Sequence, residues 1–196
     1  MDKIEKRAAL VMAAESGDGA SDQTAISGYA ARFNSMSEDL GGFFEIIEPG
    51  AFASAVKKSD VRALLNHDPS KLLGRTGVNL NIEERADGLY MEITPVDLPI
   101  YWEVLGYIKA GLITQQSFGF TVGEDRWERK DGKDLRIIKS IDRLYDVSPV
   151  TYPAYPETSV AVRSLKEFRA KNIREGTGEF SEEKWGEFLK EIRGKK

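Results

Sequence analysis

The chain has 196 residues, which suits one globular domain with short appendages. Its hydrophobic fraction of 41% supports a buried core, and its net charge of −4 argues against a protein held on nucleic acid by bulk charge. It contains no cysteine, which excludes disulfides, thiolate nucleophiles and cysteine-ligated metal centres and fits a reducing compartment.

The first half of the chain predicts short strands joined by turns. Alternating side chains favour strands throughout, except where Phe52 and Val56 lie four residues apart and favour a short helix. Strands are expected at residues 26–33, 43–47, 61–65, 72–76, 79–84 and 88–94, and the helix at 51–58. The turn at Gly77 predicts that strands 72–76 and 79–84 pair with each other.

One longer helix is predicted over residues 99–110. Pro99 lies near its start and Gly111 at its end, which are the positions these residues favour at helix termini. Asp97 is expected to cap its amino terminus. The apolar stripe expected to face the core consists of Trp102, Leu105 and Ile108.

Strands follow this helix at residues 116–122, 144–151 and 160–162. The Asp131-Gly132 pair between them predicts a hairpin turn. Because strands do not alternate with helices, a doubly wound parallel sheet is not expected. The pattern predicts a mainly β, α+β fold: a barrel or sandwich of short strands with helices outside it.

The chain is expected to divide into three parts. Residues 1–23 predict a leader and linker, 24–163 the main domain, and 164–196 a charged helical tail. Within the tail, a helix beginning at Ser181 carries one apolar stripe, formed by Trp185, Phe188, Leu189 and Ile192. Packing on the domain and docking to a partner both remain open for this stripe.

No apolar run reaches the roughly 18 residues that a membrane span needs. The apolar stretch after Arg7 is short, and acidic residues interrupt the basic start, so a secretory signal is not expected. We therefore expect a cytoplasmic protein with no membrane partner and no nucleic-acid partner.

His67 is the one histidine, so any histidine-dependent chemistry in a single chain must use it. Ser117 is the leading candidate to react with it. Phe118 and Phe120 alternate with Ser117 and Gly119, so the serine faces away from the aromatic rings, beside a glycine expected to leave room for a substrate carbonyl. A serine on a solvated strand face is the competing interpretation.

Asp146 lies among apolar residues of a predicted strand, where a carboxylate is either exposed or needs a partner such as a histidine. Together His67, Ser117 and Asp146 suggest a Ser–His–Asp relay. Asp68 is a poorer partner because it adjoins His67 in sequence, and Asp97 is better explained as a cap. No Gly-x-Ser-x-Gly elbow surrounds Ser117, which argues against an α/β-hydrolase. No carboxylate–histidine cluster has metal-ligand spacing, so no metal is expected, and no glycine-rich phosphate loop is present.

An ordered set of motifs between Thr24 and Val162 resembles the tailed-phage prohead (capsid maturation) protease family. The matching blocks are Ile26-Ser27-Gly28-Tyr29-Ala30, Glu48-Pro49-Gly50-Ala51-Phe52, Asn66-His67-Asp68-Pro69, Ile108-Lys109-Ala110-Gly111, Ser117-Phe118-Gly119-Phe120 and Asp146-Val147-Ser148-Pro149. The resemblance implies that Ser117 is the nucleophile and His67 the base. The family most often has glutamate where this chain has Asp146. It is similar to the herpesvirus assemblins, which implies a β-barrel ringed by helices.

The resemblance further implies a serine endopeptidase that cleaves scaffold and major capsid protein, and itself, inside an assembling prohead in the host cytoplasm, or in the bacterial cytoplasm for a prophage. It implies no cofactor, and a homodimer or higher oligomer. Two alternatives remain: a catalytically inactive capsid assembly or scaffold protein on the same fold, and an unrelated β-barrel binding module.

Overall fold

The computed structural model describes residues 4–10, 24–130, 132–152, 165 and 167–169. In chain order their elements are β1 (Glu5–Leu10), β2 (Ile26–Arg32), β3 (Phe43–Ile47), α1 (Ala53–Lys58), β4 (Arg62–Leu64), β5 (Leu72–Arg75), β6 (Leu80–Arg85), β7 (Gly88–Ile93), α2 (Pro99–Lys109), β8 (Gln115–Lys130) and β9 (Lys133–Val150). The expectation of a strand-rich fold with few helices is confirmed.

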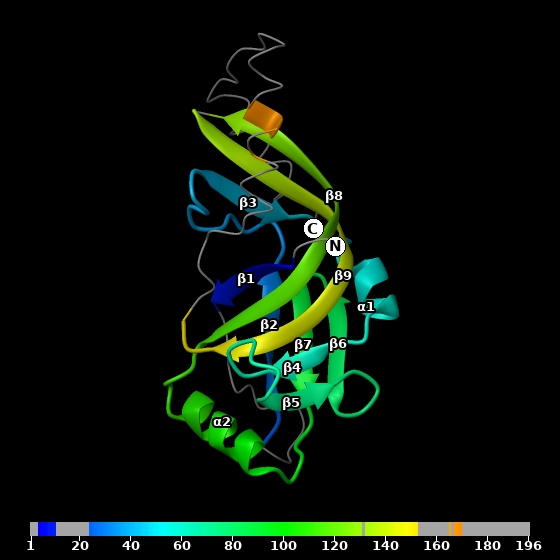
Figure 1. Ribbon diagram of the computed structural model, residues 1–196, viewed down its shortest axis with the longest axis vertical. Helices are drawn as coiled ribbons and strands as arrows, with labels where there is room; N and C mark the ends of the chain where they lie inside the picture. Colours follow the sequence, from blue (N-terminus) through cyan, green and yellow to red (C-terminus); the bar gives the residue numbers. More distant parts are fainter. Residues whose placement is uncertain (1–3, 11–23, 131, 153–164, 166, 170–196) are drawn as a thin grey trace.

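Two sheets make up this fold. The larger sheet has the order β1-β8-β9-β4-β5, and β3 also pairs with β9. The smaller sheet has the order β2-β7-β6. The predicted hairpin turn is confirmed, since Lys130 pairs with Lys133. The long β8–β9 hairpin runs through the larger sheet and extends well beyond the smaller one at the end where β3 pairs with β9 (Figure 1).

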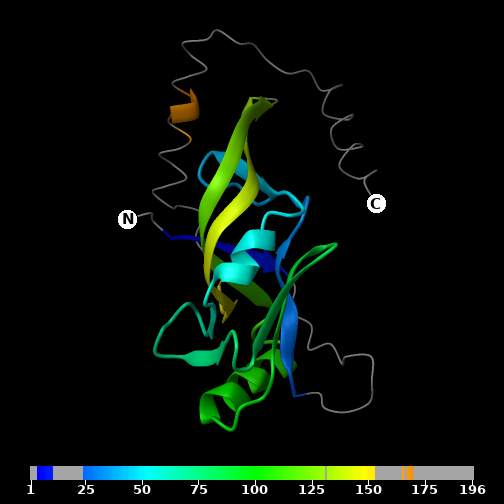
Figure 2. The same ribbon diagram turned by 90° about the vertical axis from the view of Figure 1, so that its right-hand side faces the viewer.

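The expected barrel is not confirmed. In the described ranges the two sheets share no strand ladder, and β1 and β5 lie at the two ends of the larger sheet's order. The sheets pack face to face instead, as the view turned by 90° shows (Figure 2). The helices also do not surround the strands, because α2 lies across one end of the molecule (Figure 1).

The main core lies between the sheets, and its residues come from both sheets and both helices. The alternation predicted for β7 is confirmed, since Leu89, Met91 and Ile93 are all fully buried. In α2 the buried face is formed by Tyr101, Val104, Leu105 and Ile108. The predicted stripe is therefore wrong at Trp102, which is 43% exposed and packs edge-on against Tyr101.

The predicted hairpin of residues 72–84 is also wrong. β5 pairs with β4 in the larger sheet, whereas β6 pairs with β7 in the smaller one. The Asn79 side chain accounts for this change of sheet, because its amide donates to the carbonyl oxygens of Leu73 and Thr94 and holds the chain between them. The isolated bridge between Thr76 and Leu80 is parallel, unlike the antiparallel pairing that a hairpin makes.

Two described segments from the predicted tails pack on the domain. Residues 5–10, from the expected leader, form β1 of the larger sheet. Leu165 packs with Leu40 and Phe43, and the Phe168 ring stacks on Trp127. The strand expected at 160–162 and the tail helix with Trp185 lie outside the described residues, and no helix within the described ranges is long and apolar enough to cross a membrane.

Candidate active site

β8 carries Ser117 and separates it from the aromatic side chains, as its sequence predicts. Phe118 and Phe120 are buried in the main core with their rings stacked, 4.8 Å apart between centroids. Because side chains alternate along a strand, Ser117 and Gly119 face the other side of the sheet. The core packing of Phe118 and Phe120 thus fixes the strand segment that directly follows the serine.

Pairing with β9 brings the candidate carboxylate to the same face. Ser117 lies opposite Ser148, and Gly119 lies opposite Asp146. Directly opposed residues of two antiparallel strands project to the same face of a sheet. The hairpin therefore places Asp146 beside Ser117 although 29 residues separate them in sequence.

His67 arrives from a third segment, the loop that follows β4. This strand runs parallel to β9, with Arg62 opposite Asp146 and Ala63 opposite Val147. The His67 ring then lies between the other two groups: Nε2 is 2.7 Å from Ser117 Oγ, and Nδ1 is 2.5 Å from Asp146 Oδ1. The structure brings all three predicted site residues together.

The contacts define the direction of the hydrogen bonds. An ionised carboxylate only accepts, so the neutral imidazole carries its proton on Nδ1 and donates to Asp146. Nε2 is then free to accept the hydroxyl proton of Ser117. The side chains of His67 and Asp146 are only 9% and 10% exposed, and limited contact with water strengthens both interactions.

The loop holds His67 in an unusual backbone conformation. Asn66 and His67 have φ angles of 56° and 57°, in the left-handed region that side chains other than glycine and asparagine seldom adopt. Asn66 anchors this turn to the end of β9. Its backbone N–H donates to the Pro149 carbonyl, its side-chain amide donates to the Thr151 hydroxyl, and its side-chain carbonyl accepts the Thr151 N–H.

Ser148 and Gly119 position Asp146, and sequence analysis assigned neither of them that role. The buried Ser148 hydroxyl donates to Asp146 Oδ1 at 2.6 Å. A Cβ atom on Gly119 would clash with Asp146 Oδ2. The space at Gly119 is thus occupied by the carboxylate, which corrects the expectation that it would receive a substrate carbonyl. The period-two spacing of Asp146 and Ser148 was the available signal for their shared face.

The two alternative carboxylates lie outside the relay. Asp68 accepts hydrogen bonds from the N–H and hydroxyl of Ser70, which lower the pKa of its carboxyl. Asp97 is exposed, and the N-cap of α2 is Leu98 with no side-chain hydrogen bond, so the predicted cap is wrong. Among the described residues, no three histidine, aspartate or glutamate side chains gather as a set of metal ligands.

The sequence matches a known protein family over most of its length. The family model of the caudovirus prohead serine proteases matches residues 10–172. The chain belongs to that family. The match confirms the resemblance that the motifs indicated. As a member of this family, the chain is a protease of capsid maturation.

The chain is also similar to a solved structure. The capsid assembly protease of bacteriophage T4 matches with a TM-score of 0.43 and 14% sequence identity, over 74% of this chain and 98% of that one. No curated protein matches the sequence.

Proposed function

We propose that this chain is a serine endopeptidase in which Ser117 is the nucleophile, His67 the general base and acid, and Asp146 the group that orients the imidazole. The observation that carries the proposal is the position of His67, whose two ring nitrogens contact Ser117 and Asp146 at hydrogen-bond distance. This geometry matches the roles of a serine protease triad, which are recognised by arrangement rather than by chain order.

In the acylation step, Ser117 Oγ attacks the carbonyl carbon of the scissile peptide bond while its proton moves to His67 Nε2. The tetrahedral intermediate collapses when the C–N bond breaks and the imidazolium returns that proton to the leaving amine nitrogen. Asp146 stays ionised throughout and stabilises the imidazolium through Nδ1–H. Ser148 keeps the carboxylate oxygen aimed at the ring.

In the deacylation step, water attacks the acyl ester and gives a proton to His67 Nε2. Ser117 Oγ leaves and takes the proton back, which releases a carboxylic acid and restores the enzyme. Every proton in this cycle passes through one imidazole, and no cofactor is needed.

The proposed substrates are the major capsid protein and the scaffold protein, cleaved inside the assembling prohead. The family description, a prohead serine protease of caudoviruses, supports this assignment. We also propose self-cleavage in the flanking parts of the chain, residues 1–23 and 164–196, around a main domain at 24–163. A homodimer or higher oligomer is part of the proposal and is tested by light scattering of the purified protein.

The experiment that tests the triad is labelling of the full chain by a fluorophosphonate, which reacts only with an activated serine. We expect labelling of the wild type, no labelling of Ser117→Ala, and wild-type labelling of the control Ser35→Ala, which removes an exposed hydroxyl. The chain would then be co-expressed with its capsid protein, and cleavage would be followed by mass. An inactive assembly protein predicts neither labelling nor cleavage in any variant.

A further inference from the structure

The edge of β8 beside Ser117 is occupied by the chain's own amino-terminal strand. β1 is the last strand in the order of the larger sheet, and it runs antiparallel to β8 with Arg7 opposite Phe118 and Ala8 opposite Ser117. The other edge of β8 is paired with β9. An extended peptide that adds to a sheet needs an unpaired strand edge. Along this segment of β8, that edge is already paired with β1.

The nucleophile is closed off in this arrangement. Ser117 has no exposed surface. The amino-terminal segment also places a side chain on the face that carries the triad, because Ile4 Cγ2 lies 3.5 Å from the position of a Cβ on Gly119. A substrate carbonyl therefore cannot contact Ser117 Oγ until this part of the molecule moves.

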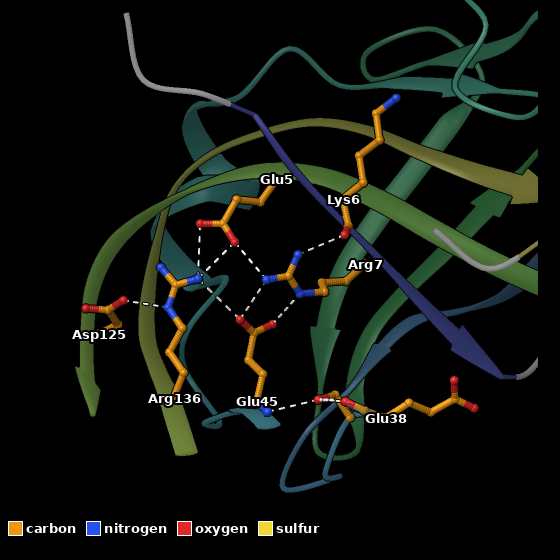
Figure 3. A network of polar contacts seen from close by, with 8 residues as sticks. Glu5, Lys6, Arg7, Glu38, Glu45, Asp125 and Arg136 are labelled. Atoms are coloured by element: carbon orange, nitrogen blue, oxygen red, sulfur yellow. Dashed lines mark hydrogen bonds and ion pairs between the residues drawn. The ribbon is translucent and has the colours of Figure 1, made fainter. Parts of the chain in front are cut away.

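Buried charged side chains contribute to the contacts that hold β1 in place. Glu5 and Arg7 are 1% and 6% exposed, and they meet Glu45 of β3 and Arg136 of β9 (Figure 3). Arg7 donates to both carboxylate oxygens of Glu45, at 2.7 and 2.9 Å. Arg136 Nη1 donates to Glu5 Oε2 at 2.8 Å.

These four side chains form two complementary halves. β1 supplies one acidic and one basic group, and the body of the protein supplies one of each. Without β1, Arg136 would still contact Glu45 at 3.3 Å and Asp125 at 2.6 Å. Removing β1 thus separates two charge-balanced partners and leaves no isolated buried charge, which is the arrangement that would be most costly.

The guanidinium groups remain charged in this setting. Burial alone would lower the pKa of Arg136, but the carboxylates of Glu5 and Glu45 outweigh it and raise that pKa. The desolvation of buried ion pairs offsets much of their attraction, so such contacts specify a partner more than they hold it. A strand held in this way can be exchanged.

We infer that β1 occupies the position of the substrate strand, and that a protein substrate binds by replacing it along β8. The inference rests on the proposed protease function and adds a recognition rule to it. Glu45 and Arg136 form a recognition site for an extended peptide that carries an acidic and a basic residue two positions apart, in the pattern Glu-x-Arg that residues 5–7 show. The free chain is accordingly self-inhibited.

The test compares two double variants of the full chain. Glu5→Ala/Arg7→Ala removes the charged contacts of β1, and Glu83→Ala/Arg85→Ala removes an exposed ion pair with the same residue types and spacing on β6. We expect the first variant to react with the fluorophosphonate at least tenfold faster than the wild type, and the control to react at the wild-type rate. Equal rates in all three chains would overturn the inference while leaving the protease function intact.

A peptide binding measurement separates the inference from catalysis. The probe is a fluorescent peptide of residues 2–14, followed by anisotropy on the Glu5→Ala/Arg7→Ala chain that also carries Ser117→Ala. We expect binding at least tenfold tighter than that of the same peptide with its Glu and Arg exchanged. If the fluorophosphonate labels none of the chains but the two peptides bind with different affinities, the proposed protease function fails and the recognition site stands. Equal affinities of the two peptides would overturn the recognition site.

A second variant guards against misfolding of the first. Ala8→Pro interrupts the backbone pairing with β8 and leaves every charged side chain in place. Circular dichroism reports whether each variant is folded. Faster labelling of either folded variant, reversed by the peptide of residues 2–14, supports the inference, and the absence of this effect in a folded Ala8→Pro chain contradicts it.

Discussion

The triad and the β1 charge network are two buried polar clusters on opposite faces of one strand. On one face of β8, Ser117 meets His67 and Asp146 in a chain of three groups with one formal charge. On the other face, the Arg7 guanidinium lies 5.7 Å from the Phe120 ring and joins a network of balanced charges. A peptide lying along β8 presents alternate side chains to these two faces, so one strand can serve chemistry and recognition at once.

The difference between the clusters lies in what each loses when one member is removed. The triad carries one formal charge, on Asp146, so replacing Ser117 leaves no buried charge unpaired and costs activity rather than stability. The network is the reverse, because any single removal strands a buried charge. Three substitutions test this contrast.

The largest expected effect is on the network. Arg136→Met leaves the two buried carboxylates of Glu5 and Glu45 with one cation, Arg7, between them, and we expect it to lower the free energy of unfolding by about 3–5 kcal/mol. Arg126→Met, which removes an exposed arginine from two surface ion pairs, should cost less than about 1 kcal/mol. Urea unfolding of both variants provides the measurement, and equal losses would contradict the contrast.

The next effect is on the triad. Gly119→Ala places a Cβ against the Asp146 carboxylate and displaces it from His67, so we expect about a 100-fold lower labelling rate of Ser117. The matched control is Gly106→Ala in α2, where a Cβ meets nothing within 4 Å and helix propensity should raise stability slightly. Normal labelling of a folded Gly119→Ala chain would mean that Asp146 does not orient the imidazole.

The smallest effect tests the support of the carboxylate. Ser148→Ala removes one hydrogen bond to Asp146 but leaves its contact with His67, and we expect about a tenfold lower labelling rate. The loss should fall on the rate of reaction at Ser117 rather than on binding of the peptide of residues 2–14. Weaker peptide binding with an unchanged labelling rate would place Ser148 in recognition instead.

The sequence predicted correctly those features that depend on contacts between neighbouring residues, and those indicated by motifs that follow one another in order along the chain. The alternation around Phe118, the Asp131-Gly132 turn and the lone His67 were all readable, and they led to the three residues that the structure brings together. It failed for the pairing of β5 and β6, where the turn at Gly77 was correct but Asn79 directs the chain to a second sheet.

β1 shows why a family pattern was also insufficient. The family match begins at residue 10, so nearly all of this strand precedes it. Residues 5–7 are charged, and charged residues near a chain terminus ordinarily favour a solvated segment. The burial of Glu5 and Arg7 depends on Arg136 and Glu45, which lie 131 and 38 residues away from them.

The sequence by itself determined which three residues form the proposed triad, because a single histidine, an alternating strand and a motif order are properties of the chain. The tertiary structure alone decided what surrounds them: the turn that Asn66 fixes, the carboxylate that fills the space at Gly119, and the strand that pairs with β8 beside Ser117. These depend on contacts between distant segments, whose free energies arise only when the sheets pair and exclude water.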